Sequence, residues 1–258
     1  MKQLLISILL FTALVGCKKE INVDLQNVSP QIVIEATVTN ATYAEVTVSK
    51  SVAFSNSNTY PKVSGATVNI SDNGVNYVLT EEKAGTYSNN SLIGVPGHTY
   101  NLSVKVEGKE YTSTSIMPLQ VHLDTLLLEK LFWGNESIWA VKPQYTDPAG
   151  FGHHYMFIET INGKLFPEYW VWDDRIVNNS ISTIPLIPLT QSDSTIHVND
   201  TIEVEMRCID KNVFRYFTAL QGSQNNATTP ANPENTITGG ALGYFSAHTT
   251  QKKKIKVQ

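Results

Sequence analysis

The feature that most constrains this chain is an alternation of apolar and polar residues that recurs through its first half. From Ile34 to Thr39, apolar Ile, Ala and Val alternate with Glu and Thr. The same period of two recurs in residues 46–48, 66–70, 75–79 and 100–106. Successive side chains of a β-strand point to opposite faces, so each segment predicts a strand with one face on a core and the other in water.

Turn residues separate these segments and set how the strands connect. Asp72-Asn73-Gly74 lies between two of them, and Glu107-Gly108-Lys109 turns the chain back into a strand over residues 111–116. Short strands at this spacing, without a helical period, are typical of a sandwich of about seven strands. We therefore predict an immunoglobulin-like β-sandwich over residues 30–118, ending at Pro118.

Residues 119–258 predict a second β-rich domain with one short helix, which makes the whole fold mostly β. Strands are expected at residues 141–145, 154–161, 169–172 and, most clearly, 202–208. Asp210 is a suitable N-cap residue for a helix over residues 211–221, in which apolar residues recur at helical spacing before Gly222. A polar loop with two prolines then follows over residues 223–236.

The N-terminal segment predicts export and lipid attachment. A basic residue precedes an apolar run from Leu4 to Val15, and Leu14-Val15-Gly16-Cys17 matches the lipobox of bacterial lipoproteins. The run is shorter than the about 20 residues that a membrane-spanning helix needs. We expect residues 1–16 to be a signal peptide, Cys17 to carry fatty-acyl chains such as palmitate, and residues 17–29 to be a tether. The alternative is an unlipidated secretory signal, which would place a small residue after the cut.

The net charge argues against nucleic-acid binding, and the cysteine content argues against a disulfide within the chain. The formal net charge is −4, and a mildly acidic chain argues against binding to nucleic acid. The one basic cluster, residues 252–256, is interpreted as a solvated tail or an edge strand. With Cys17 lipidated, Cys208 has no partner for a disulfide within the chain. Its alternation with Ile202, Val204 and Met206 predicts a buried thiol on the core face.

No recognisable catalytic motif is present in the sequence. We find no G-x-S-x-G, H-E-x-x-H or P-loop, and we expect no catalytic residue, cofactor or metal, and no enzyme activity. His153-His154, His197 and His248 could converge on a metal, but scattered histidines are more often surface or hydrogen-bonded core residues. Glu203 with Glu205 and Asp173-Asp174 are interpreted as solvated charges rather than a glycosidase pair.

All four tryptophans lie in the second half of the chain and offer a candidate binding surface. Trp170 and Trp172 would share one face of a strand. With Trp133 nearby in the sequence, and with Tyr169 and Trp139, they could form an aromatic platform for a glycan or a peptide. The alternative is that they fill the second core, since tryptophan is highly buried on average.

The ordered motifs of the chain resemble one family. After the lipobox come "IVIEATVTN", "VSGATVNISDNG", the helix "VFRYFTALQG" and the closing "NPENTITGGALGYFSA". This set resembles the domain of unknown function 4249 family. The resemblance implies an outer-membrane lipoprotein, on the cell surface or the periplasmic face, from bacteria with Sus-type uptake loci. Family members are often encoded beside TonB-dependent receptors, and the family brings no established catalytic residues.

Two functional hypotheses follow from the sequence. The first is an accessory lipoprotein that binds or supports a TonB-dependent outer-membrane receptor in nutrient uptake. The second is an independent glycan- or peptide-binding lipoprotein that uses the tryptophan-rich half.

The resemblance also suggests O-glycosylation, because the same bacterial group modifies exported proteins at Asp-Ser/Thr followed by an apolar residue or threonine. Thr125, Ser194 and Thr201 fit that pattern.

Overall fold

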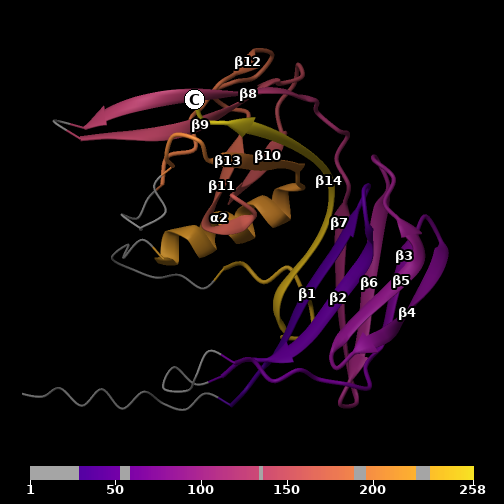
Figure 1. Ribbon diagram of the computed structural model, residues 1–258. Helices are drawn as coiled ribbons and strands as arrows, with labels where there is room; N and C mark the ends of the chain where they lie inside the picture. Colours follow the sequence, from indigo (N-terminus) through magenta and orange to yellow (C-terminus); the bar gives the residue numbers. More distant parts are fainter. Residues whose placement is uncertain (1–28, 53–58, 134–135, 189–195, 225–232) are drawn as a thin grey trace, which may run out of the picture.

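The computed structural model describes residues 29–52, 59–133, 136–188, 196–224 and 233–258, drawn in colour in Figure 1. The first seven strands are β1 (Ile32–Thr39), β2 (Tyr43–Lys50), β3 (Thr67–Asp72), β4 (Val75–Lys83), β5 (Thr86–Ile93), β6 (Thr99–Val106) and β7 (Lys109–Ile116). The others are β8 (Leu123–Trp133), β9 (Glu136–Thr146), β10 (His154–Ile161), β11 (Lys164–Asp173), β12 (Ile181–Ser182), β13 (Thr201–Cys208) and β14 (Leu242–Lys256). The described helix is α2 (Lys211–Gln224). The protein is therefore mostly β, as the sequence predicts.

Strands β1 to β7 form a sandwich whose two layers are joined through β4. The order of pairing is β1-β2-β5-β4-β3-β6-β7. Every second side chain points inward and is buried, as in β6, where Tyr100, Leu102 and Val104 are at most 2% exposed. The alternation in the sequence thus encodes this core directly. The two turns that the sequence indicates are both formed, and Asn73-Gly74 and Glu107-Gly108 have the positive φ values of a tight hairpin.

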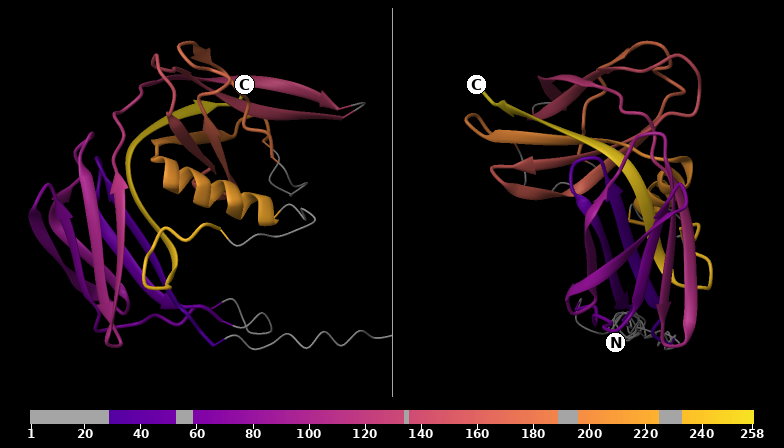
Figure 2. Two further views of the ribbon diagram at one scale, coloured as in Figure 1. Left: turned by 180° about the vertical axis from the view of Figure 1, so that it is seen from behind. Right: turned by 90° about the vertical axis from the view of Figure 1, so that its right-hand side faces the viewer.

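Strand β14 joins the sandwich to the rest of the molecule. Its first half lies parallel to β1, from Leu242 beside Val33 to His248 beside Thr39. Its second half pairs with β13, and Figures 1 and 2 show it curving from one unit into the other. Ile237, Ala241 and Phe245 belong to the same buried cluster as the sandwich residues. The C-terminal segment therefore completes the sandwich. The sandwich predicted from the sequence, residues 30–118, did not include this segment.

The C-terminal unit has three layers. A sheet in the order β11-β10-β13-β14 lies between a smaller sheet, β12-β9-β8, and helix α2. Tyr155, Phe157 and Val204 pack on the side of the smaller sheet. Met156 on the opposite face packs with Val213 and Phe217 of the helix. The helix is only 14 residues long, and none of the described helices is long and apolar enough to cross a membrane.

Helix α2 starts where the sequence indicates. The Asp210 carboxylate accepts hydrogen bonds from the backbone N–H groups of Asn212 and Val213, as an N-cap residue does. Its other oxygen accepts a hydrogen bond from Ser115 of β7 and one from the Ile116 N–H. The cap therefore also ties the C-terminal unit to the sandwich.

Candidate functional site

The described tryptophans do not form the aromatic platform proposed from the sequence. Trp170 is 5% exposed, stacks on Phe166, and donates a hydrogen bond from its indole N–H to the Ile187 carbonyl. Trp172 lies on the same face of β11, half-buried, with its ring 4.9 Å from that of Phe157. Trp133 ends β8, and its side chain lies outside the described part of the structure. This face of β11 meets the smaller sheet, so Trp170 and Trp172 contribute to the core instead.

The structure describes two of the four residues that the sequence predicts to be modified. Thr125 at the start of β8 and Thr201 at the start of β13 are both exposed. Ser194 and Cys17 lie outside the described residues. O-glycosylation and lipid attachment stay predictions.

Two aspartates and a histidine meet at one end of the C-terminal unit, and we call Asp147, His153 and Asp174 the DHD cluster. The carboxyl side chain of Asp147 is 0% exposed and that of Asp174 is 3% exposed. His153 Nδ1 lies 3.7 Å from an oxygen of Asp147 and 3.2 Å from one of Asp174. The potential ligand atoms of all three residues lie within 4.8 Å of one another.

Strand pairing brings the members of the DHD cluster together. Asp147 follows β9, His153 precedes β10, and Asp174 follows β11. His154 pairs with Asp173 across the β10–β11 ladder, which places the next residues of the two chains side by side. In the sequence, His153 belongs to a histidine pair, Asp174 belongs to an aspartate pair, and Asp147 belongs to no motif. The pairing between distant segments that unites them has no local sequence signal.

Hydrogen bonds hold the two carboxylates in place. Asp174 accepts one from the Gly152 N–H at 2.7 Å and one from the His153 N–H at 2.9 Å. Asp147 accepts one from the Tyr155 hydroxyl. Burial, together with this bond to a carboxylate, raises the pKa of Tyr155 far above its ordinary value, so the hydroxyl keeps its proton and remains a donor.

One oxygen of the cluster has no partner despite complete burial. Asp147 Oδ2 makes no hydrogen bond to any described residue, and neither does His153 Nδ1. Among the ion pairs of the described residues, no lysine or arginine contacts Asp147 or Asp174. A buried carboxylate normally has a partner for each oxygen or a neighbouring cation, so this arrangement is a candidate site.

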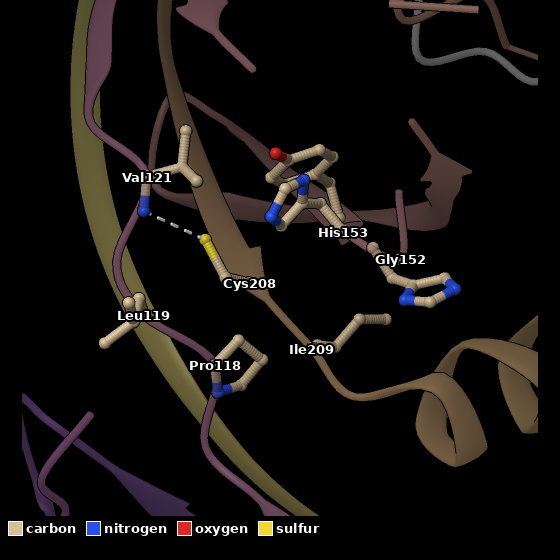
Figure 3. A pocket seen from close by; sticks show the side chains of 9 residues that line it. Pro118, Leu119, Val121, Gly152, His153, Cys208 and Ile209 are labelled. Carbon is tan, nitrogen blue, oxygen red and sulfur yellow. Dashed lines mark hydrogen bonds between the residues drawn. The ribbon is translucent and has the colours of Figure 1, made fainter. Parts of the chain in front are cut away.

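The cavity beside this cluster is too small for an organic substrate. Its volume is about 30 Å³. Figure 3 shows its lining from the segment after β7 (Pro118, Leu119, Val121), from His153 and from the end of β13, where Cys208 accepts a hydrogen bond from the Val121 N–H. Cys208 is 3% exposed and burial raises its pKa, which confirms the prediction of a buried thiol. The space would admit one water molecule or a single ion.

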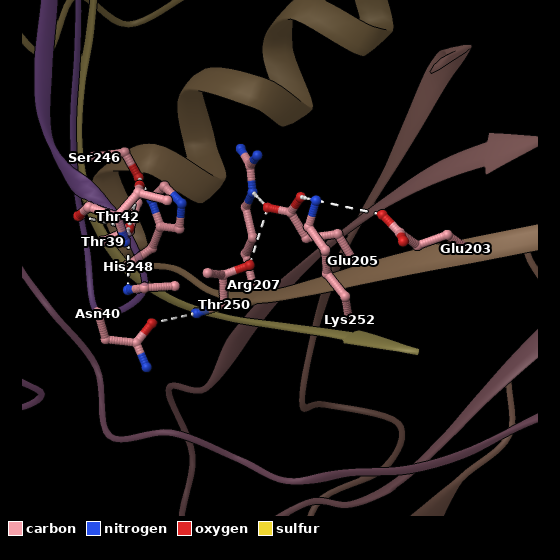
Figure 4. A network of polar contacts seen from close by, with 11 residues as sticks. Thr39, Asn40, Thr42, Glu203, Glu205, Arg207, Ser246, His248, Thr250 and Lys252 are labelled. Atoms are coloured by element: carbon pink, nitrogen blue, oxygen red, sulfur yellow. Dashed lines mark hydrogen bonds and ion pairs between the residues drawn. The ribbon is translucent and has the colours of Figure 1, made fainter. Parts of the chain in front are cut away.

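A second polar network lies where β14 passes from one unit to the other (Figure 4). Glu205 is ion-paired with Arg207 and lies 3.3 Å from Lys252, which also reaches Glu203. Cations of their own sheet therefore neutralise the two glutamates. The basic C-terminal cluster is part of a strand that pairs with β13, where Lys252 lies opposite Glu205 and Lys254 opposite Glu203.

His248 is the buried histidine of this junction. Its side chain is 2% exposed, and Nδ1 lies 2.9 Å from the Ser246 hydroxyl. Burial, with a smaller contribution from Arg207, lowers its pKa to about 3. His248 is therefore neutral near pH 7 and acts as a hydrogen-bonded core residue, not as a ligand.

The fold and the candidate site define a mostly β protein of two units joined by one strand, with a buried DHD cluster at one end. A comparison with protein families matches residues 18–254 to the family described as "Domain of unknown function (DUF4249)". The chain belongs to this family, as its sequence motifs indicate. No curated protein matches the chain.

Proposed function

We propose that the protein is an outer-membrane lipoprotein, anchored through Cys17, that serves as a non-enzymatic accessory component of a TonB-dependent nutrient-uptake system. The lipobox in the sequence and the family membership support the location and the class of partner.

The observation that carries this proposal is the path of the chain away from its tether. Strand β1 begins soon after the tether and runs parallel to β14, which continues into the C-terminal unit. A strand rises about 3.3 Å per residue, so the 15 residues of β14 follow a curved path of roughly 50 Å. An anchor before β1 would therefore place the sandwich near the membrane and the C-terminal unit beyond it. We interpret the sandwich as a spacer.

The β8–β9 hairpin offers a contact surface for the receptor. Each strand has 11 residues, and the third strand of the sheet, β12, covers only Tyr145 and Thr146 of β9. Figure 1 shows the hairpin extending beyond the other strands of this unit. Phe132 on it is 75% exposed and Leu127 is 39% exposed. Unpaired strand edges and exposed apolar side chains are features by which one protein recognises another.

The burial of Trp170 weighs against the glycan- or peptide-binding alternative, which used the tryptophan-rich half as its site. Trp170 is in the core, and the cavity near Cys208 is too small for a sugar ring or a peptide side chain. We therefore keep the receptor accessory as the proposal.

The proposal is tested by purifying the affinity-tagged protein from its own cells in mild detergent. We expect a TonB-dependent receptor to be recovered with it. Cys17→Ala should leave a larger precursor that incorporates no labelled palmitate, and recovery of the receptor should fall with it. If the wild-type protein purifies alone in every detergent, and its deletion leaves nutrient uptake unchanged, the accessory role is wrong.

A further inference from the structure

The DHD cluster places two buried carboxyl groups beside one another. Asp147 and Asp174 are almost fully buried, and their carboxyl oxygens lie within 4.8 Å of each other. Two buried carboxylates at this separation repel one another strongly in a medium of low dielectric constant. The N–H and O–H groups that bond to them supply partial charges only. His153, a third exposed, contacts both carboxyl groups, and His154 follows it at the start of β10.

We propose that the DHD cluster binds one divalent transition-metal ion, Zn²⁺ or Mn²⁺, through Asp147, His153 and Asp174. The fully buried Oδ2 of Asp147 makes no hydrogen bond, and His153 Nδ1 makes none either, although it lies 3.2 Å from Asp174 Oδ2. A metal ion would supply the missing partner of each residue. An imidazole nitrogen with two carboxylates favours Zn²⁺ or Mn²⁺ over Ca²⁺, which takes oxygen ligands.

The spacing of the ligand atoms fits such an ion. Metal–ligand distances of about 2.0–2.1 Å place two ligands of a tetrahedral site about 3.3 Å apart. His153 Nδ1 is 3.2 Å from Asp174 Oδ2 and 3.7 Å from Asp147 Oδ1, the oxygen that accepts the Tyr155 hydrogen bond. A small rotation of the Asp147 carboxyl group would bring its free oxygen to the ion. Three protein ligands leave a further coordination position, which the partly exposed side of His153 opens to water.

The outer contacts of the cluster are those expected around metal ligands. The Tyr155 hydroxyl orients Asp147, and two consecutive N–H groups orient Asp174. The bound ion would connect the segments after β9, before β10 and after β11 at one end of the C-terminal unit. The ion would therefore stabilise this end of the C-terminal unit. The sequence predicts no metal site, because the two aspartates are distant from each other in the chain and reach His153 only through the fold.

Metal binding is tested on the purified full-length protein after treatment with a chelator. The protein is dialysed against Zn²⁺ or Mn²⁺, and the bound metal is measured by mass spectrometry beside the thermal unfolding midpoint. We expect one ion per chain and a higher midpoint. Asp147→Asn keeps an oxygen that can accept the Tyr155 hydrogen bond, so it should fold, yet it should weaken binding at least about 100-fold. His153→Gln, at a partly exposed residue, should weaken binding as well.

The matched control is Asp173→Asn. Asp173 is the neighbour of Asp174 in the sequence but is ion-paired with Arg175 at 2.7 Å outside the cluster. This variant should bind metal as the wild type does. Failure of the wild type to bind either ion at one per chain would overturn the inference, as would wild-type affinity in both Asp147→Asn and His153→Gln.

Discussion

Glu159 on β10 is a buried acid that belongs to neither polar site. It is 1% exposed and lies opposite Val204 on the face that packs against the smaller sheet. Its Oε1 atom has no hydrogen-bond partner among the described residues. Burial raises its pKa to about 7, from an ordinary value of 4.5. The unfolded chain therefore releases this proton near pH 4.5, whereas the folded protein holds it until about pH 7.

This difference in pKa predicts that Glu159 lowers the stability of the folded protein more at high pH than at low pH. The folded state loses stability as the pH rises from about 4.5 to 7, because the unfolded chain gains a charge that the folded core resists. Glu159→Gln removes this loss. The unfolding free energy of the variant minus that of the wild type should be about 2–3 kcal/mol larger at pH 8 than at pH 5.

Urea unfolding at the two pH values measures the effect, and Glu45→Gln, at an exposed residue of β2, is the control. A Glu159→Gln effect of equal size at pH 5 and pH 8 would show that the carboxyl is not held protonated.

Single residues could be predicted from the sequence where a local pattern fixed their surroundings. The alternation around Cys208 placed its thiol on the core face, and the residue before the helix identified Asp210 as its cap. Asp147 and Glu159 have no such pattern. Their burial depends on strands that come together from distant parts of the chain, and that pairing decides their chemistry.

At the scale of elements, β14 is the strand that sequence patterns described least well. Its lysines indicate a solvated tail or an edge strand, yet it is the longest described strand and lies between β1 and β13. Glycine is needed because β14 approaches β1 closely. Gly243 has φ +106°, and a Cβ placed there would lie 2.0 Å from the Ile34 carbonyl oxygen.

Gly243→Ala therefore predicts a large loss of stability. The clash is with backbone and cannot be relieved without separating the two strands, so we expect at least about 4 kcal/mol. Gly150→Ala is a matched control, because its φ is +108° and no atom lies within 4 Å of the added Cβ. That variant should lose only about 1–3 kcal/mol of stability, which is the cost of placing alanine at a positive φ. Equal losses in denaturant unfolding would mean that β14 does not pack against β1 as described.

The other strands could be predicted from the sequence where apolar and polar residues alternate along them. Strands β1, β3, β6, β7 and β13 match the predicted segments closely, and the period of two explains why. Strand β5 has the sequence TYSNNSLI, whose central residues are polar, so only its pairing with β2 and β4 makes it a strand. The helix was predicted because its cap and its apolar spacing are both local features.

At the scale of the whole molecule, one strand makes two predicted units inseparable. Phe245 and Ala247 of β14 complete the sandwich core, and Asn40 after β1 accepts a hydrogen bond from the Thr250 N–H beyond it. Removing either unit would expose the core of the other. Tests of which unit contacts a receptor therefore need single-residue changes at the surface.

The central claim is that the C-terminal unit contacts a TonB-dependent receptor while the sandwich acts as a spacer. A photo-crosslinking amino acid at position 132 of β8, compared with one at position 78 of β4, tests it most directly in intact cells. Phe132 and Val78 are 75% and 57% exposed, so both positions tolerate the change. The account predicts a covalent adduct with the receptor from position 132 and none from position 78. Adducts from position 78 alone, or from neither position, would contradict it.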